Sequence, residues 1–306
     1  MNIFATIIPV FAIILLGWLS RKKGFIHTDF IGPANSLVFY LALPAMIFSA
    51  ISRASLTAHF NIGILIVTIS TAMLTFILAW IFGKAHRLKQ GQLGSYVQTS
   101  FHGNLGYIGL AVAFYYLGED GLVKASILTG FLMIVQNLLS VLSLTVNSDQ
   151  PDSTKHTRTL FRNIAGNPVI LSAMAGIVCS FFNISIPLIL EQSLDILSGL
   201  ALPMALLIIG ASISFQEARH RIKRVLSTSA IKLFLMPGLG YIAYRVLDFP
   251  PGEYLPGLIL LASPTATISY VMAKEMKGDP DLAVMAISTC TLLSSLAYTF
   301  WLNVAG

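Results

Sequence analysis

Leu41-Ala42-Leu43-Pro44 and Leu200-Ala201-Leu202-Pro203 are copies of one tetrapeptide, and each lies inside a long apolar segment of the 306-residue chain. The copies are 159 residues apart, and at the same spacing Pro9 in the first apolar segment matches Pro168 in the sixth. Matches at a constant spacing indicate that one structural unit has been duplicated. The sequence therefore predicts two related halves.

Composition places the chain in a membrane. Hydrophobic residues make up 56% of the sequence, charged residues make up 10%, and the mean hydropathy is +0.79, whereas soluble domains carry about 25% charged residues. Ten apolar segments are each close to the roughly 20 residues that a helix needs to cross the hydrocarbon core. They lie at residues 2–20, 33–52, 62–83, 95–117, 121–145, 164–182, 191–215, 226–247, 254–274 and 280–302. We therefore predict an all-α integral membrane protein with ten transmembrane helices.

A polar stretch divides the chain. Residues 147–163 are rich in Asp, Ser, Thr and Lys, and we interpret them as an exposed cytoplasmic linker. Residues 1–146 then form a first five-helix repeat, and residues 164–306 form a second. Because five spans are an odd number, the second repeat enters the membrane in the opposite direction. The two halves are therefore predicted to be inverted repeats that meet near the middle of the bilayer.

The basic residues predict an orientation. Arg21, Lys22 and Lys23 follow the first apolar segment and no basic residue precedes it, which argues against a cleaved signal peptide. Counted from this loop, alternate loops contain 15 of the 19 Lys and Arg residues. Since such loops stay in the cytoplasm, we predict an inner-membrane protein with both termini on the non-cytoplasmic side. The basic residues are spread over separate loops, and so nucleic-acid binding is not expected.

Two of the predicted helices look broken near their centres. The fourth contains His102-Gly103-Asn104-Leu105-Gly106-Tyr107-Ile108-Gly109, and the ninth contains Ala262-Ser263-Pro264-Thr265-Ala266-Thr267. Gly lowers helix stability, and Asn prefers caps and turns. In the repeat, Asn104 falls opposite Pro264, so the two breaks coincide. We expect Ser263 to be the N-cap of a new half-helix and Pro264 to be its first residue.

Irregular backbone at this depth is tolerated only where protein or a water-filled cavity covers it. Half-helices that begin near Leu105 and Pro264 would direct free N–H groups and the positive ends of their dipoles toward the centre, where they would attract an anion. The structural alternative is that small residues permit close helix packing and that a proline only kinks a span. Kinks are the first interpretation of Pro44 and Pro203, and a lining role is the second.

The order and spacing of four motifs resemble the auxin efflux carrier family over essentially the whole chain. These motifs are Arg21-Lys22-Lys23-Gly24, Leu41-Ala42-Leu43-Pro44, Gly103-Asn104-Leu105-Gly106-Tyr107-Ile108-Gly109 and Ala262-Ser263-Pro264. Bacterial members include permeases for malate, malonate and similar acids. The resemblance implies two inverted five-helix repeats, as in NhaA and the bile-acid symporters, with fourth and ninth helices that cross at the substrate site. It also implies a scaffold made of the first two spans of each half, which forms a homodimer, and a mobile transport unit made of the other three.

Carried over to this chain, the crossover site falls on Asn104 and on Pro264 with its neighbours. The substrate-binding candidates are His102, Gly103, Asn104, Leu105, Gly106, Ser263, Pro264, Thr265 and Thr267. Plant members have a long loop between the halves, but here that loop is short. Regulation through the loop is therefore not implied, and auxin is not the expected substrate.

Other polar residues in the spans each admit two interpretations. His102 is the titratable side chain closest to a break, and it either couples protons or bonds to neighbouring backbone. Lys232 either draws anions into the inner vestibule or extends to the cytoplasmic interface. Gln98, Gln136 and Asn137 either line that vestibule or form hydrogen bonds between helices.

The expected function is secondary transport of a small organic anion, such as a mono- or dicarboxylate, by a rocking or elevator movement. A sodium-coupled symporter of the bile-acid type and a membrane sensor that binds a carboxylate without transporting it are the alternatives. An enzyme is not expected, because the spans lack a nucleophile–base pair, an Asp pair and a His-Glu-x-x-His motif. Cys179 and Cys290 lie in apolar spans, so neither a disulfide nor a metal site is expected. No cofactor is expected.

Overall fold

The computed structural model describes residues 3–54, 59–147, 166–214 and 222–306. Helices dominate this part of the chain, which contains no strand beyond an isolated bridge between Gly103 and Thr265. The prediction of an all-α protein is confirmed. The predicted linker at residues 147–163 lies outside the described residues except for Asn147, and the division into two repeats stays a prediction.

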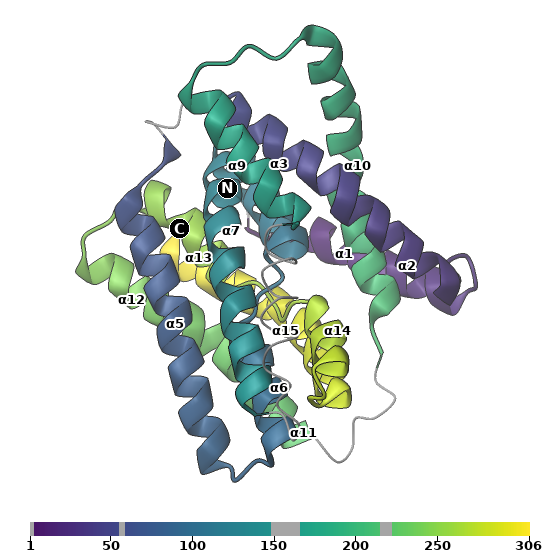
Figure 1. Ribbon diagram of the computed structural model, residues 1–306, viewed down its shortest axis with the longest axis vertical. Helices are drawn as coiled ribbons and strands as arrows, with labels where there is room; N and C mark the ends of the chain where they lie inside the picture. The colour runs from purple at the N-terminus through teal and green to yellow at the C-terminus, as the bar shows by residue number, and fades with distance from the viewer. Residues whose placement is uncertain (1–2, 55–58, 148–165, 215–221) are drawn as a thin grey trace. The chain divides into compact units, whose positions relative to one another are not determined.

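The helices follow the apolar segments closely (Figure 1). Those before the linker are α1 (Ile3–Lys22), α2 (Thr28–Leu37), η1 (Val38–Ala42), α3 (Leu43–Ser52), α5 (Ile62–Ala85), α6 (Gln90–Phe101), η2 (Leu105–Gly109) and α7 (Leu110–Val146). Those after it are α9 (Pro168–Phe181), α10 (Leu188–Ser212), α11 (Ile222–Ala230), η4 (Ile231–Leu235), α12 (Met236–Val246), α13 (Pro251–Leu261), α14 (Ile268–Glu275) and α15 (Pro280–Ala305).

Six helical runs in the described part are long and apolar enough to cross a membrane. They are Thr28–Ser52, Ile62–Ala85, Leu105–Val146, Leu188–Ser212, Ile222–Val246 and Pro280–Ala305. The fourth and ninth predicted spans are interrupted, so α6, α13 and α14 are individually too short. The run from Leu105 has 42 residues, about twice what a bilayer needs, and Gly118 divides it with a φ of 72° and a ψ of −161°. Ten transmembrane helices therefore stay a prediction.

Prolines explain the two π-helical segments within long runs. Segment η1 ends two residues before Pro44, and η4 ends two residues before Pro237. Proline has no backbone N–H, so it cannot donate the i→i−4 hydrogen bond of an α-helix. The wider π turn before each proline accommodates the missing bond, and the helix continues after it. The helix is thus locally widened before Pro44, where a kink was expected. Lys232 lies within the second π-helical segment, η4.

The described helices form two compact units. Unit 1 comprises Met1–Asn61, Gly106–Phe131 and Ala165–Ile213, and unit 2 comprises Ile62–Leu105, Leu132–Ile164 and Ser214–Gly306. This division resembles the scaffold and transport unit implied by the family, but Gly106–Phe131 packs with unit 1 and not with the remainder of the fourth and fifth spans. One reason is a polar contact inside unit 1, in which the Tyr107 hydroxyl donates to Asn35 Oδ1 at 2.7 Å.

Glycines bring the helices of unit 1 together. Helix α1 packs against α10, and α3 packs against α9 (Figure 1). A Cβ atom at Gly17 would collide with the Leu207 backbone, and one at Gly210 would collide with the Ile14 backbone. Small residues allow this close approach, as is common between helices in membranes.

Unit 2 packs around α15 and α5. Helices α11 and α14 contact α15, while α6, α12 and α13 contact α5. Trp301 Nε1 donates to the Leu233 carbonyl at 2.8 Å, and Thr68 Oγ1 lies 2.6 Å from the Tyr244 hydroxyl. The indole nitrogen of Trp301 and the hydroxyl of Tyr244 each have a hydrogen-bond partner. These contacts therefore hold the helices together without leaving a buried polar atom unsatisfied.

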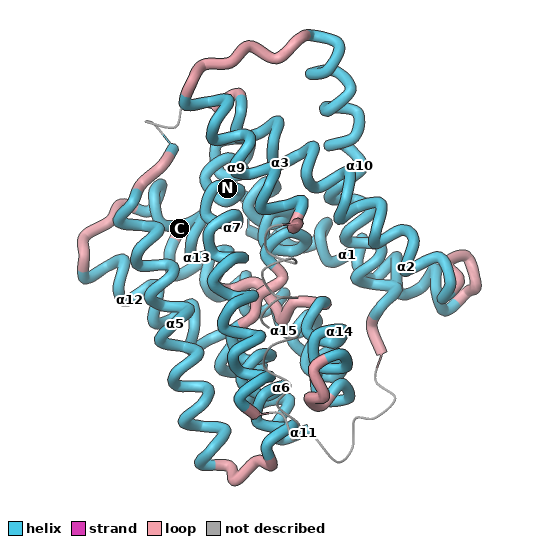
Figure 2. Tube along the Cα trace, viewed as in Figure 1, coloured by secondary structure: helices cyan, strands magenta, loops and turns pink. Residues whose placement is uncertain are grey.

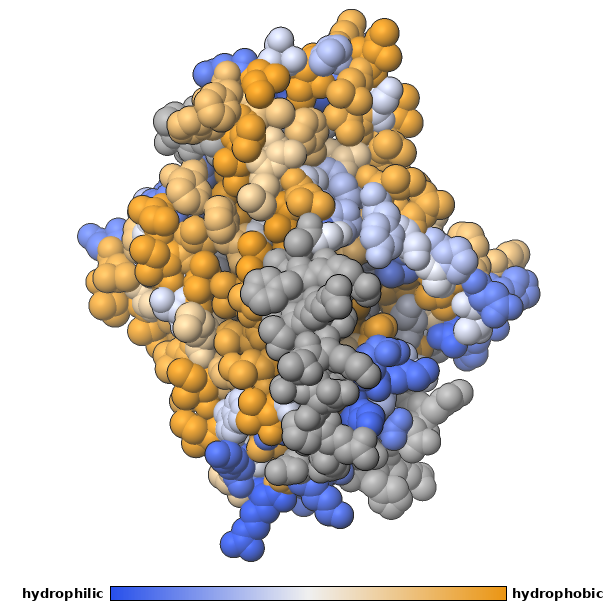
Figure 3. Space-filling model, viewed as in Figure 1, coloured by the Kyte–Doolittle hydropathy of each residue, from blue (hydrophilic) through white to orange (hydrophobic). Residues whose placement is uncertain are grey.

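The outer surface of α5 is apolar, as expected for a helix that faces lipid (Figure 3). Ile66, Ile77 and Ile81 each expose more than half of their surface. Hydrophilic residues gather where α5 turns into α6, at the end of this apolar surface (Figure 3). The pattern supports a multi-pass membrane protein.

Candidate functional site

The first break lies between α6 and η2. Helix α6 ends at Phe101, its C-cap His102 is extended, and helical structure resumes at Leu105, as the sequence predicted (Figure 2). A Cβ atom at Gly103 would collide with Ser263 Oγ and would lie 3.2 Å from Lys232 Cε. Glycine therefore allows two other segments of unit 2 to approach this backbone closely.

The second break lies between α13 and α14. Residues 262–267 are not helical, and α14 begins at Ile268 with Thr267 as its N-cap. The expectation that Ser263 caps this half-helix and that Pro264 begins it is wrong. Ser263 Oγ instead donates to the Leu260 carbonyl at 2.7 Å, at the end of α13. Helix α14 begins later because residues 264–266 are extended and pair with the first break.

The two breaks meet as a short antiparallel pair. Asn104 N–H donates to the Pro264 carbonyl at 2.7 Å, and Ala266 N–H donates to the His102 carbonyl at 2.9 Å. Gly103 and Thr265 form the bridge between these bonds. Backbone groups freed by each break are thus satisfied by the other, as buried polar groups require.

Side chains from neighbouring helices complete the crossing. Gly103 N–H donates to Gln136 Oε1 at 3.1 Å, and Gln136 Nε2 donates to the Phe101 carbonyl at 3.3 Å. The His102 ring, through Nδ1, lies 2.9 Å from Ser140 Oγ. Gln136 therefore bonds between helices, and His102 bonds to a side chain and not to neighbouring backbone. Whether His102 couples protons stays a prediction.

The other residues predicted to bind substrate or to line the vestibule lie at different distances from the two breaks. Leu105 is buried beside the first break, and Gly106 is the first residue of the next segment of unit 1. Thr265 Oγ1 donates to the Thr99 carbonyl at 2.9 Å, and Gln98 Nε2 lies 3.2 Å from Met272 Sδ. Asn137 is partly exposed and, in the hydrogen bonds of the described residues, makes none to either break.

Lys232 lies beside the crossing of the two breaks. Its side chain is 0% exposed, and Nζ donates to the carbonyl of Leu261, the last residue of α13, at 2.7 Å. Lys232, Gln98 and Gln136 are all 0% exposed, and the vestibule role expected for them stays a prediction. If Lys232 is protonated, its charge compensates the negative end of α13. Among the described residues, no ion pair to a carboxylate includes Lys232.

Sequence reasoning missed two residues of this cluster. Ser140 holds His102, and Cys290 on α15 lies with its Sγ 3.4 Å from Thr265 N. Small polar residues and cysteines are common in membrane helices, so neither residue gave a signal. Only the paired breaks show that they share one site.

Comparison with known proteins fits this architecture. Residues 2–302 match the model of a family described as membrane transport protein. A "Putative malonate transporter" of Rhizobium meliloti (strain 1021) is 26% identical over 97% of this chain and 94% of its own length. Uncharacterized transporters of Methanothermobacter thermautotrophicus and Escherichia coli (strain K12) are 23% and 22% identical, over 97% and 98% of this chain and 96% of each relative. The chain therefore belongs to the membrane transport protein family, the family of the auxin efflux carriers.

Proposed function

We propose that the chain is a secondary carrier of small organic anions, mono- or dicarboxylates such as malate or malonate. The observation that carries this proposal is the Lys232 side chain, which is buried beside the paired breaks. A buried charge is costly unless an opposite charge and further hydrogen bonds compensate it. The ammonium has three donors, and a substrate carboxylate would supply the missing charge.

The paired breaks add positive partial charge to the same place. Helical structure begins again at Leu105 and at Ile268, where the first N–H groups have no partner within their own helix. Helix N-termini favour anions. We propose that the substrate is held by Lys232 and by Asn104 and Pro264 with their neighbours, namely His102, Gly103, Leu105, Gly106, Ser263, Thr265 and Thr267.

The proposed architecture has ten transmembrane helices in two inverted repeats, with both termini outside an inner membrane and a homodimeric scaffold. The duplicated tetrapeptide and the distribution of basic residues support this arrangement. Alternating access would follow from an elevator movement of the unit that contains the crossing. The substrate class is supported by the "Putative malonate transporter" of Rhizobium meliloti, 94% of whose length aligns with this chain.

Lys232 also bears on the coupling ion. A sodium ion near the Leu261 carbonyl would be repelled by the ammonium that is bound there. We therefore favour transport coupled to protons or to no ion over the sodium-coupled alternative. A sensor would use the same pocket but would show binding without flux.

Uptake of radiolabelled malonate and malate into proteoliposomes tests the proposal. We expect saturable uptake, and we expect Lys232→Met to raise the concentration for half-maximal uptake at least tenfold, because a charge-assisted hydrogen bond contributes about 1.5–3 kcal/mol and 1.4 kcal/mol corresponds to tenfold. Met fills a similar volume, and replacing a buried charge by an apolar group often leaves stability unchanged. Lys274→Met, at an exposed lysine of α14, is the matched control.

Three outcomes would redirect the interpretation. Binding without uptake would favour the sensor. Uptake that requires sodium would favour the bile-acid type. Neither binding nor uptake of any mono- or dicarboxylate would contradict the proposed substrate class.

A further inference from the structure

The imidazole ring of His102 is held by a serine of a neighbouring helix. Its Nδ1 lies 2.9 Å from Oγ of Ser140 on α7, and Ser140 is 0% exposed. Both residues belong to unit 2, as do the two breaks that pair beside them. The Phe101 ring stacks on the imidazole, with centroids 6.2 Å apart and planes inclined by 20°. The imidazole is therefore fixed on one face and at one nitrogen.

The hydroxyl of Ser140 makes no other hydrogen bond among the described residues. Other buried serines of unit 2 donate to their own helix instead. Ser143 Oγ donates to the Ser140 carbonyl at 2.8 Å, and Ser100 Oγ donates to the Tyr96 carbonyl at 2.7 Å. The acceptor available to the Ser140 hydroxyl proton is therefore Nδ1 of His102.

The direction of this hydrogen bond decides which ring nitrogen carries the proton. If Ser140 donates, Nδ1 is the acceptor, the neutral ring is protonated at Nε2, and only the Nε2–H group lacks a partner. If Nδ1–H donates, the hydroxyl proton and the Nε2 lone pair both lack one. A doubly protonated ring would also leave the hydroxyl proton unpaired and would add a buried charge. Because buried polar groups are normally satisfied, the tautomer protonated at Nε2 is favoured.

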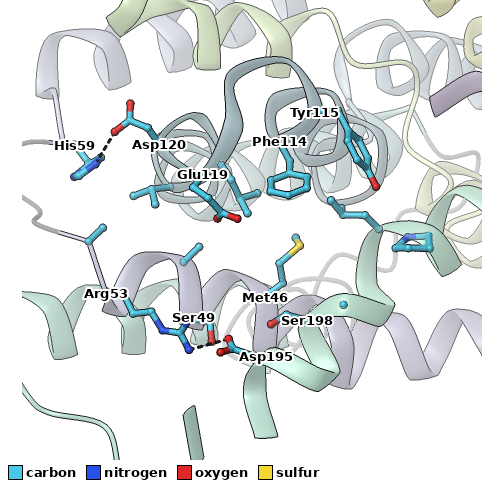
Figure 4. A pocket seen from close by; sticks show the side chains of 17 residues that line it. Met46, Ser49, Arg53, His59, Phe114, Tyr115, Glu119, Asp120, Asp195 and Ser198 are labelled. Atoms are coloured by element: carbon cyan, nitrogen blue, oxygen red, sulfur yellow. Dashed lines mark hydrogen bonds and ion pairs between the residues drawn. The ribbon is translucent and has the colours of Figure 1, made fainter. Parts of the chain in front are cut away.

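Nε2 of His102 is then a donor that needs an acceptor. The residue is 3% exposed, and the hydrogen bonding of its ring within the described part of the chain is confined to Nδ1. His59 in unit 1 shows the contrast, because its Nε2 lies 2.8 Å from Asp120 Oδ1 at the wall of a cavity (Figure 4). A carboxylate oxygen satisfies Nε2 there, and a carboxylate is the group that the proposed substrate carries.

We propose that Ser140 is a positioning residue, which holds His102 in the tautomer that donates from Nε2–H to a carboxylate oxygen of the substrate. This role rests on the proposed function, because it takes the ligand of the crossing to be a carboxylate. His102 then acts as a neutral donor, and no proton is transferred. A neutral donor orients the carboxylate without adding a second charge near Lys232, whose side chain approaches the adjacent Gly103.

Solid-state nitrogen NMR of protein labelled in its histidine rings reads the tautomer without any substrate. The His102 signals are those that disappear in His102→Gln. A variant that retains His102 as its only histidine gives the same assignment if His102→Gln does not fold. At neutral pH we expect a proton on Nε2 and none on Nδ1. Ser140→Ala should shift the Nδ1 signal, whereas Ser143→Ala, at an equally buried serine that bonds to a backbone carbonyl, should not.

Uptake of radiolabelled malonate into proteoliposomes tests the donor role. His102→Leu should raise the concentration for half-maximal uptake about tenfold, because a hydrogen bond to a charged group is lost. His102→Gln should raise it by a smaller factor, since the amide nitrogen of Gln reaches about as far as Nε2 and donates but does not titrate. Ser140→Ala should raise it about fivefold with an unchanged maximal rate. Ser140→Thr, which keeps the hydroxyl, should restore it, and Ser143→Ala is the matched control.

A proton on Nδ1, or on both ring nitrogens, would overturn the tautomer. Equal losses in His102→Gln and His102→Leu would overturn the donor role, and wild-type kinetics in Ser140→Ala would overturn the positioning role. If the wild type transports no carboxylate, the proposed function fails, while the NMR signals still decide what Ser140 does to the ring. If the wild type transports malonate but these variants do not differ as expected, this inference alone fails.

Discussion

Gly103 occupies a position where any side chain would disturb the crossing. A Cβ atom there would collide with Ser263 Oγ and crowd Lys232 Cε and Leu105 Cδ2. We expect Gly103→Ala to destabilise the protein by about 1–3 kcal/mol, the usual cost of overpacking. Thermal unfolding in detergent measures this, with Gly32→Ala as the control because a Cβ atom at Gly32 meets nothing within 4 Å. Equal melting temperatures for the two variants would contradict the close approach.

The two helix restarts, at Leu105 and at Ile268, differ in how well the sequence predicts them. The restart of the helix at Leu105 was predictable because Gly103 and Asn104 are poor helix formers. Ser263 and Pro264 have the right chemistry for a helix start, yet the start is at Ile268. Residues 264–266 instead form backbone hydrogen bonds with residues 102–104, and these bonds outweigh the local preference for a helix start at Pro264. Rules based on neighbouring residues cannot predict bonds to a segment so distant in sequence.

At the scale of elements, the two interrupted helices depend on each other. Asn104→Leu and Pro264→Ala are expected to reduce carboxylate uptake at least tenfold while leaving membrane insertion intact, because Leu and Ala favour a continuous helix where Asn104 and Pro264 favour a break. Pro264→Ala also restores an N–H that favours continuation of a helix. Uptake kinetics and membrane-fraction abundance test both variants. Unchanged kinetics in both would count against the proposed site.

Gly118 is a second element-scale feature, since it separates two helices within α7. Its φ of 72° and ψ of −161° lie in a region open almost only to glycine. Gly118→Ala is therefore expected to cost about 1–3 kcal/mol of stability, although a Cβ atom would meet nothing within 4 Å there. The midpoint of chemical denaturation measures this. A midpoint equal to that of the wild type would show that the helices do not need this turn.

On the scale of the whole molecule, the orientation can be tested by labelling single cysteines in a background without Cys179 and Cys290. His86→Cys, in the turn after α5, is predicted to be cytoplasmic, and Leu247→Cys, after α12, is predicted to be outside. A membrane-impermeant maleimide should label Leu247→Cys in intact cells and His86→Cys only after permeabilisation. The reverse pattern would invert the proposed topology.

Much of the fold could be predicted from the sequence, because length and apolarity alone constrain helices in a membrane. The predicted segments at residues 62–83 and 280–302 fall within α5 and α15. The assignment of Gly106–Phe131 to unit 1 and the burial of Lys232 in the turn before Pro237 were not predictable. Both depend on packing between segments that are distant in sequence.

The backbone pair between residues 102–104 and 264–266 has a consequence for how such proteins diversify. Its two hydrogen bonds use peptide groups, which every residue except proline provides in full, so the crossing itself encodes little about which acid is carried. Selectivity is then left to the surrounding side chains, which mutation can exchange one at a time. A new substrate preference can arise without dismantling the framework that positions it.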